Sequence, residues 1–173
     1  RGTTSTLTTS ASGKETSIFM IPDGTARNGL RSGLTSQLTS GVAVIQVAST
    51  LPAITDSDTI IDGGTQTYNI TNTNTTTLNT ATTVGIDGLT VPAIQGPEVQ
   101  LQPSSTFYST ATSGLIIGSA TTTPANTTVQ NMSVLGFSAA TATTDESNIY
   151  VIAGATGTMI HWNAIGTTAT SYT

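Results

Sequence analysis

Three closely spaced aspartates, Asp56, Asp58 and Asp62, are the best candidates for a chemically active site in this sequence. Carboxylate oxygens at short intervals suit Ca²⁺, which takes roughly six to eight oxygen ligands. The segment lacks the full EF-hand spacing and its terminal glutamate. Alternatively, Asp56 and Asp58 hydrogen-bond the backbone at a corner while Asp62 and Gly63 form a turn. The sequence therefore offers a candidate calcium site and a purely structural alternative.

The remaining charged residues do not suggest catalysis. The cationic side chains Lys14, Arg27 and Arg31 all precede the strand-rich part of the chain, whereas an enzyme that cleaves polysaccharides needs a base or a carboxylate pair on one face. The single histidine, His161, has no nucleophile motif around it. We expect no enzymatic activity and no cofactor other than the candidate calcium ion.

The only tryptophan, Trp162, directly follows the only histidine. A tryptophan face can stack on a sugar ring or another flat partner. The same side chain can pack in the core or plug the end of the fold, and tryptophan is also favoured at the centre of protein interfaces. All three roles are open from the sequence, and we predict an interface role for Trp162 together with Leu7.

Four N-x-S/T sequons are candidate sites of N-glycosylation. They begin at Asn69, Asn74, Asn126 and Asn131. Several sequons arise by chance in a chain so rich in threonine, and their use requires a host that glycosylates.

Composition indicates an all-β protein. Charged residues make up 8% of the chain, while 40 threonines, 18 serines and 17 glycines favour strands and corners over helices.

The net charge of −5 without a basic patch argues against a nucleic-acid partner. No apolar run is long enough to span a membrane. Because there is no cysteine, disulfides and thiolate metal sites are excluded. A start at Arg1 rather than Met suggests a processed form or a fragment.

The chain divides into two expected parts, an extended N-terminal arm over residues 1–16 and one β-domain over residues 17–173. The arm is polar except for Leu7, and it is either a frayed tail or a strand that pairs with a neighbouring subunit. Leucines at intervals of four within residues 27–41 suggest a short helical turn or a loop that caps the domain. Strands are expected at the apolar runs that follow: 42–47, 51–54, 59–64, 97–101, 114–118, 128–137 and 147–165.

Several ordered segments resemble secreted right-handed parallel β-helix domains of the adhesin and surface-protein type. The matching segments run from Leu51-Pro52-Ala53-Ile54-Thr55 and Asp58–Gly63, through Gly96–Leu101 and Gly114–Ile117, to Val129–Phe137 and the coil over residues 147–171. The resemblance covers residues 42–171 and implies stacked coils with apolar interiors and threonine-rich outer faces. The later strand centres are also spaced by about 20 residues, the length of a solenoid coil. His161-Trp162-Asn163 departs from the pattern, since such coils carry a small residue before the asparagine.

We therefore expect a short right-handed parallel β-helix, with a pilin-like β-sandwich that uses residues 1–16 as a donated strand as the alternative fold. The expected function is that of an extracellular structural subunit that stacks head to tail into a surface filament. The alternative is a fragment of a cell-surface adhesin or surface-layer protein that binds a glycan or host surface. A polysaccharide-degrading enzyme is a third, weaker interpretation.

Overall fold

The computed structural model describes residues 13–78, 83–84, 86, 88–90, 93–108, 113–137 and 147–171. In this part of the chain nearly all regular structure is β-strand, and one short helix, α1 (Gly64–Asn69), interrupts it. The prediction of an all-β protein, made from the composition, is confirmed. Leu7 and most of the predicted N-terminal arm lie outside the described residues.

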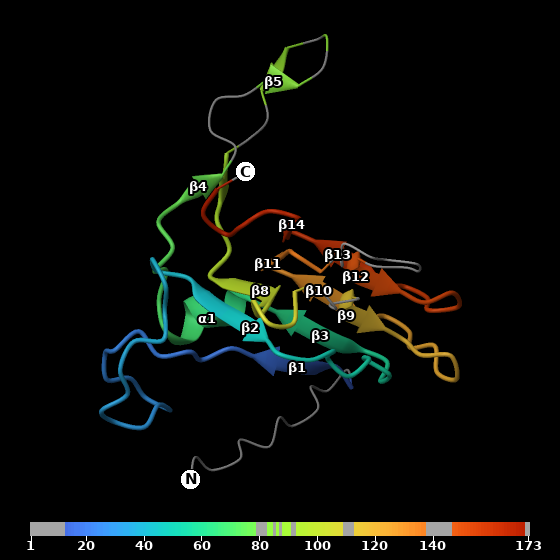
Figure 1. Ribbon diagram of the computed structural model, residues 1–173, viewed down its shortest axis with the longest axis horizontal. Coiled ribbons are helices and arrows are strands. Elements are labelled where there is room, and N and C mark those ends of the chain that lie inside the picture. The colour runs from blue at the N-terminus through green and yellow to red at the C-terminus, as the bar shows by residue number, and fades with distance from the viewer. Residues whose placement is uncertain are drawn as a thin grey trace.

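Three sheets of parallel strands form the body of the molecule (Figure 1). Sheet I contains, in spatial order, β1 (Glu15–Ile18), β3 (Thr59–Asp62), β10 (Thr128–Gln130) and β13 (Met159–His161). Sheet II contains β2 (Ala43–Val47), β8 (Val99–Pro103), β11 (Met132–Val134) and β14 (Ala164–Ile165). Sheet III pairs β9 (Ser113–Ile117) with β12 (Ser147–Val151), and Ile54 adds a parallel bridge to Ile117.

The chain visits these sheets in turn, so neighbouring strands of one sheet are separated by strands of the others. After β3 it passes through β8 and β9 before it returns to sheet I as β10, and then β11 and β12 precede β13. Parallel strands cannot be joined by a tight hairpin, and here the long connections are the strands of the other sheets. The strand order of sheets I and II is thus the order along the chain.

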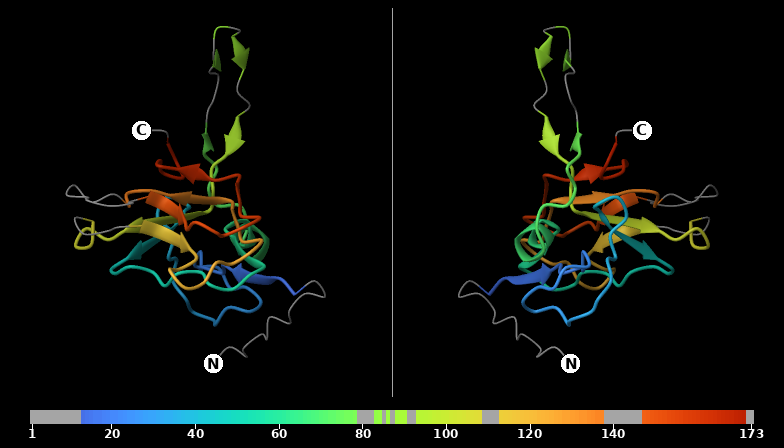
Figure 2. Two further views of the ribbon diagram at one scale, coloured as in Figure 1. Left: turned by 90° about the vertical axis from the view of Figure 1, so that its right-hand side faces the viewer. Right: turned by 90° about the vertical axis from the view of Figure 1, so that its left-hand side faces the viewer.

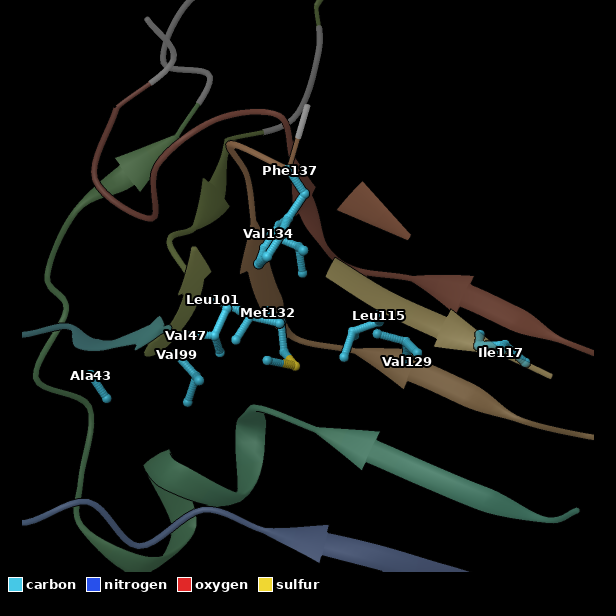
Figure 3. Packing of buried hydrophobic residues seen from close by; sticks show 10 residues of the cluster. All are labelled: Ala43, Val47, Val99, Leu101, Leu115, Ile117, Val129, Met132, Val134 and Phe137. Carbon is cyan, nitrogen blue, oxygen red and sulfur yellow. The ribbon is translucent and has the colours of Figure 1, made fainter. Parts of the chain in front are cut away.

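Alternate residues of these strands point into a common apolar interior. In sheet I, Val129 lies beside Ile61, and in sheet II, Val134 lies beside Leu101. Ten buried hydrophobic side chains form this core, which Figure 3 shows: Ala43, Val47, Val99, Leu101, Leu115, Ile117, Val129, Met132, Val134 and Phe137. Each of the nine side chains larger than alanine contributes on the order of 1.5–3 kcal/mol when fully buried. The interior therefore holds the three sheets together.

The corners that follow β3, β10 and β13 of sheet I occupy equivalent positions in successive layers. Because Asp62, Gln130 and His161 are paired in sheet I, the residues that follow them, Gly63, Asn131 and Trp162, occupy equivalent corner positions. A Cβ on Gly63 would collide with the backbone oxygen of Asn131, so only glycine fits there. The two later corner residues adopt left-handed backbone conformations.

The segment after β1 covers the first strands of the sheets. Phe19, Ile21 and Leu38 are partly buried and pack against the core, and residues 27–41 form turns rather than the short helix considered from the sequence. Helix α1 fixes this segment through the fully buried Gln66, whose amide donates to the Ile21 carbonyl at 2.7 Å and accepts from the Ile21 amide at 2.8 Å. Residues 15–16, the last two of the predicted arm, belong to β1 and pair with β3.

A hairpin-like extension projects from the body, and the sequence analysis did not predict it. Two antiparallel pairs build it, β4 (Thr77–Leu78) with β7 (Ile94–Gln95) and β5 (Thr83–Val84) with β6 (Leu89–Thr90). Figures 1 and 2 show that it extends past the end of the molecule that carries β14. Its exposed apolar side chains include Ile86 and Leu89.

Candidate binding cleft and open sheet end

The three aspartates of the candidate calcium site are not gathered in one place. Among the described residues, no group of three His, Cys, Asp or Glu side chains could hold a metal ion. Asp58 accepts a hydrogen bond from Asn126 Nδ2 at 3.1 Å, and the backbone oxygen of Asp56 accepts one from Thr59. Asp58 and Asp62 stand at opposite ends of β3. Of the structural alternative, the turn at Asp62-Gly63 is present, since Asp62 Oδ1 accepts a hydrogen bond from the Gly64 amide, whereas the Asp58 side chain contacts the Asn126 side chain.

Asp62 instead organises the outer face of sheet I. Its Oδ1 accepts hydrogen bonds from the Gly64 amide at 2.8 Å and from Asn131 Nδ2 at 2.7 Å. Its Oδ2 accepts one from Gln130 Nε2 at 2.7 Å. Hydrogen bonds to a charged acceptor are stronger than neutral ones. Asp62 thereby fixes two amide side chains of the neighbouring strand and corner.

A cleft of about 360 Å³ lies beside this network. Two aromatic side chains from different elements line it, Tyr68 of α1 and Trp162 of the corner between β13 and β14, and they are 88% and 72% exposed. The remaining lining residues are Asp62, Gly64, Thr67, Asn72, Gln95, Gly96, Pro97, Glu98, Gln130 and Asn131. The cleft thus combines two accessible rings with amides and carboxylates.

Glu98 gives the cleft a second, buried carboxylate. Its oxygens accept hydrogen bonds from the backbone amides of Thr73 and Asn74 and, at 2.6 Å, from the Thr73 hydroxyl. These donors compensate the burial of the charge. No Lys, Arg or His stands among the described residues that line the cleft. The cleft is therefore acidic.

Trp162 is exposed, so it does not pack in the core, which is one of the roles that the sequence leaves open. Its backbone φ is +55°, close to the +57° of Asn131 at the preceding equivalent corner. Asparagine tolerates this left-handed conformation, whereas for a bulky residue it is an outlier. The indole contacts the ring of His161, with ring centroids 4.3 Å apart and planes inclined by 50°. The interface role predicted for Trp162 stays a prediction, as does that of Leu7.

The interior columns of apolar side chains are open at one end. Val129, Val134 and Ile117 are completely buried, while Ile160, Ile165 and Val151, which pair with them on the last strands, are 39%, 49% and 37% exposed. In the described part of the chain, β13 and β14 have a strand partner on one side only. At the opposite edge of sheet I, β1 also has one partner, and its Ile18 is 52% exposed.

The four sequon asparagines differ in accessibility. Asn74 is completely buried, and its Nδ2 donates to the Pro97 and Ala169 carbonyls, so the folded chain leaves no room for a glycan there. The Nδ2 atoms of Asn69, Asn126 and Asn131 donate to Phe19, Asp58 and Asp62 respectively. Asn126 is exposed, whereas Asn69 and Asn131 are half-buried, so Asn126 is the most accessible of the four candidates.

Comparison of the chain with protein-family models, curated proteins and solved structures gave no match. The helical structure in the described residues is too short to cross a bilayer. The function must therefore be argued from the cleft, the open sheet end and the chemistry of their side chains.

Proposed function

We propose that this protein is an extracellular structural subunit, built on a short right-handed parallel β-helix, whose copies stack head to tail into a surface filament. The observation that carries the proposal is the open end of the interior. Ile160, Ile165 and Val151 continue three buried columns and are left partly exposed by the last strands. One more layer of strands would bury all three.

The order in which the chain visits sheets I, II and III supports the β-helix. Each return to a sheet adds one parallel strand beside the previous one, and connections between parallel strands of one sheet are right-handed in nearly all proteins. A pilin-like sandwich consists of antiparallel sheets. The pairings within sheets I–III are parallel, which favours the β-helix over that alternative.

The two ends of sheet I support stacking in one direction. An unpaired strand edge is a template for another chain. Within the described part of the chain, β13 presents such an edge at the open end and β1 presents one at the other end. The β13 strand of one copy can therefore pair with β1 of the next in the parallel sense of the sheet. A contact between two different surfaces that does not close into a ring produces a filament.

The composition supports an extracellular setting. The chain has few charges and is rich in hydroxyl and amide side chains, which also make contacts between neighbouring strands such as that from Gln130 to Asp62. The ion pair between Asp23 and Arg27 lies in the segment that follows β1, outside the sheets. Such a surface stays hydrated without depending on charge.

Two variants test the stacking, each at one end of the proposed joint. Ile165→Lys places a charge at the open end, and Ile18→Lys places one beside β1. We expect the unmodified protein to form fibres in electron micrographs and a rising mass by light scattering as its concentration increases. Each variant alone should remain monomeric, because one of the two joining surfaces is lost. Tyr108→Lys, at an exposed aromatic elsewhere, is the matched control and should still assemble.

Mixing the two variants gives the sharpest result. An Ile18→Lys copy retains an intact open end and an Ile165→Lys copy retains an intact β1 edge, so the mixture should form dimers but no fibres. A protein that stays monomeric at every concentration would contradict the proposal. Assembly that Ile165→Lys abolishes and Ile18→Lys leaves unchanged would show that the open ends meet each other, which contradicts head-to-tail stacking.

A further inference from the structure

We infer that the cleft between Tyr68 and Trp162 is a binding site for a neutral carbohydrate, with the indole of Trp162 as the stacking surface. The inference does not depend on the stacking of copies. Its first support is the pair of exposed rings on one cleft, Tyr68 from α1 and Trp162 from the last corner of sheet I. The C–H face of a sugar ring carries a weak positive potential and packs on the negative face of an aromatic ring.

The backbone of Trp162 is the second support. The equivalent corner one layer earlier holds Asn131, a residue type that accepts a left-handed backbone, while Trp162 adopts the same conformation at a cost of roughly 1–2 kcal/mol. The side chain recovers little of this by burial, because most of it is exposed. Strained residues of this kind concentrate at functional sites. The conformation holds the indole at the cleft, where it is accessible to a ligand.

The polar lining matches sugar hydroxyls. Gln95, Gln130, Asn131 and Asn72 offer amide donors and acceptors, and Asp62 adds a carboxylate acceptor. The oxygens of Glu98 already accept hydrogen bonds from Thr73 and Asn74, so Glu98 contributes charge rather than a free acceptor. A hydroxyl both donates and accepts, so it can satisfy either type of group. The hydrogen bonds from Gln130 and Asn131 to Asp62 fix these amides before a ligand arrives, which reduces the entropy lost on binding.

The charge of the cleft selects among carbohydrates. Asp62 and Glu98 line it, and no basic side chain stands among its described lining residues. A uronate, a sialic acid or a sulfated sugar would bring its anion close to two carboxylates with no counter-charge. The volume of about 360 Å³ lies near the lower end of the range of ligand pockets, which suits one or two sugar rings. The site therefore fits a short, neutral saccharide unit.

Because Trp162 is the only tryptophan, its fluorescence reports on the site directly. The unmodified protein is titrated with lactose, cellobiose, mannobiose and chitobiose, and with digalacturonate as the acidic counterpart. We expect a saturable change in emission with at least one neutral disaccharide and none with digalacturonate at the same concentration. No change with any neutral disaccharide would overturn the inference, and equal or tighter binding of digalacturonate would overturn its charge argument.

Two variants locate the site by calorimetry or ligand-observed NMR, which do not need tryptophan. Trp162→Asn retains a residue suited to the corner, and Tyr68→Ser removes the second ring. Each should weaken binding of the active disaccharide roughly tenfold or more. Tyr108→Ser, at an exposed aromatic outside the lining, should bind as the unmodified protein does. Undiminished binding by both cleft variants would place the sugar elsewhere and refute the assignment. Fibre formation is scored separately, so the failure of stacking and the failure of sugar binding are distinguishable.

Discussion

Because the interior is open at one end, we predict that two isoleucine-to-alanine substitutions lower the free energy of unfolding by different amounts. Ile117→Ala removes a completely buried side chain from the middle of sheet III, and Ile165→Ala removes a half-exposed one from the last strand of sheet II. Isoleucine to alanine in a closed core costs about 2–5 kcal/mol, because the lost transfer free energy adds to that of the cavity. The Ile165 side chain is half-exposed, so it gains only about half of the free energy of burial, and its truncation leaves no closed cavity. We therefore expect Ile165→Ala to lower the free energy of unfolding of the isolated monomer by about 1 kcal/mol.

Association of copies should increase the loss of stability that Ile165→Ala causes. If another copy covers the open end, Ile165 becomes buried and its truncation acquires the cost of a closed site. The loss of stability caused by Ile165→Ala should then rise with protein concentration, toward about 2–5 kcal/mol, while that of Ile117→Ala stays constant. Urea unfolding followed by tryptophan fluorescence, at concentrations below and above the onset of assembly, measures both.

Two results would refute the reasoning. A cost of Ile165→Ala equal to that of Ile117→Ala in dilute monomer would mean that the chain itself covers this end. A small cost that is independent of concentration, in a protein that does assemble, would mean that copies meet through another surface.

Three further predictions concern Trp162, Asp62 and the ion pair between Asp23 and Arg27. Trp162→Asn should change the free energy of unfolding by less than about 1 kcal/mol in urea denaturation, because relief of the left-handed strain offsets the small buried part of the indole. Asp62→Ala should cost about 2–3 kcal/mol in the same assay, since it removes the acceptor of three hydrogen bonds, and Asp62→Asn should cost less. The hydrogen bond from Arg27, together with one from the Thr25 amide, lowers the pKa of Asp23 from 3.8 to about 2. Stability from this pair is therefore present above about pH 3.8 and is lost as the pH falls toward 2. Arg27→Gln should raise the pKa of Asp23 toward 3.8 in an NMR titration of its carboxyl carbon.

The strands of sheets I–III could be predicted because they consist of short apolar runs that are stabilised by burial. Val42–Val47 was expected as a strand, and β2 covers Ala43–Val47; the predicted run 114–118 contains most of β9. Apolar and β-branched residues in short runs suit pleated, half-buried surfaces. The turn chemistry at Asp62-Gly63 was also foreseeable, since the aspartate accepts a hydrogen bond from the Gly64 amide two residues later.

Helix α1 and the projecting extension could not be predicted in the same way. The helix sequence Gly64–Asn69 has no side-chain cap and no apolar periodicity, and tertiary contacts fix it through Gln66 and the Ile21 backbone. A local signal did exist for the extension, because an aspartate–glycine pair at 87–88 between Val84 and Leu89 is a hairpin signature. The cleft carries no local signal, since parallel pairing brings together residues that are up to 100 positions apart in the chain.

Trp162 shows where sequence and structure have to be considered together. The sequence marks it as a departure from the coil pattern, and its chemistry is consistent with a core or plug role, with the predicted interface role and with a ligand role. The structure removes the first role by exposing the ring, and it adds that the backbone is strained at a corner where Asn131 fits without strain. A side chain that costs conformational energy and gains little from burial contributes little to folding. The sugar site inferred for the polar cleft beside Tyr68 gives this side chain a role outside folding, and the predicted interface gives it another.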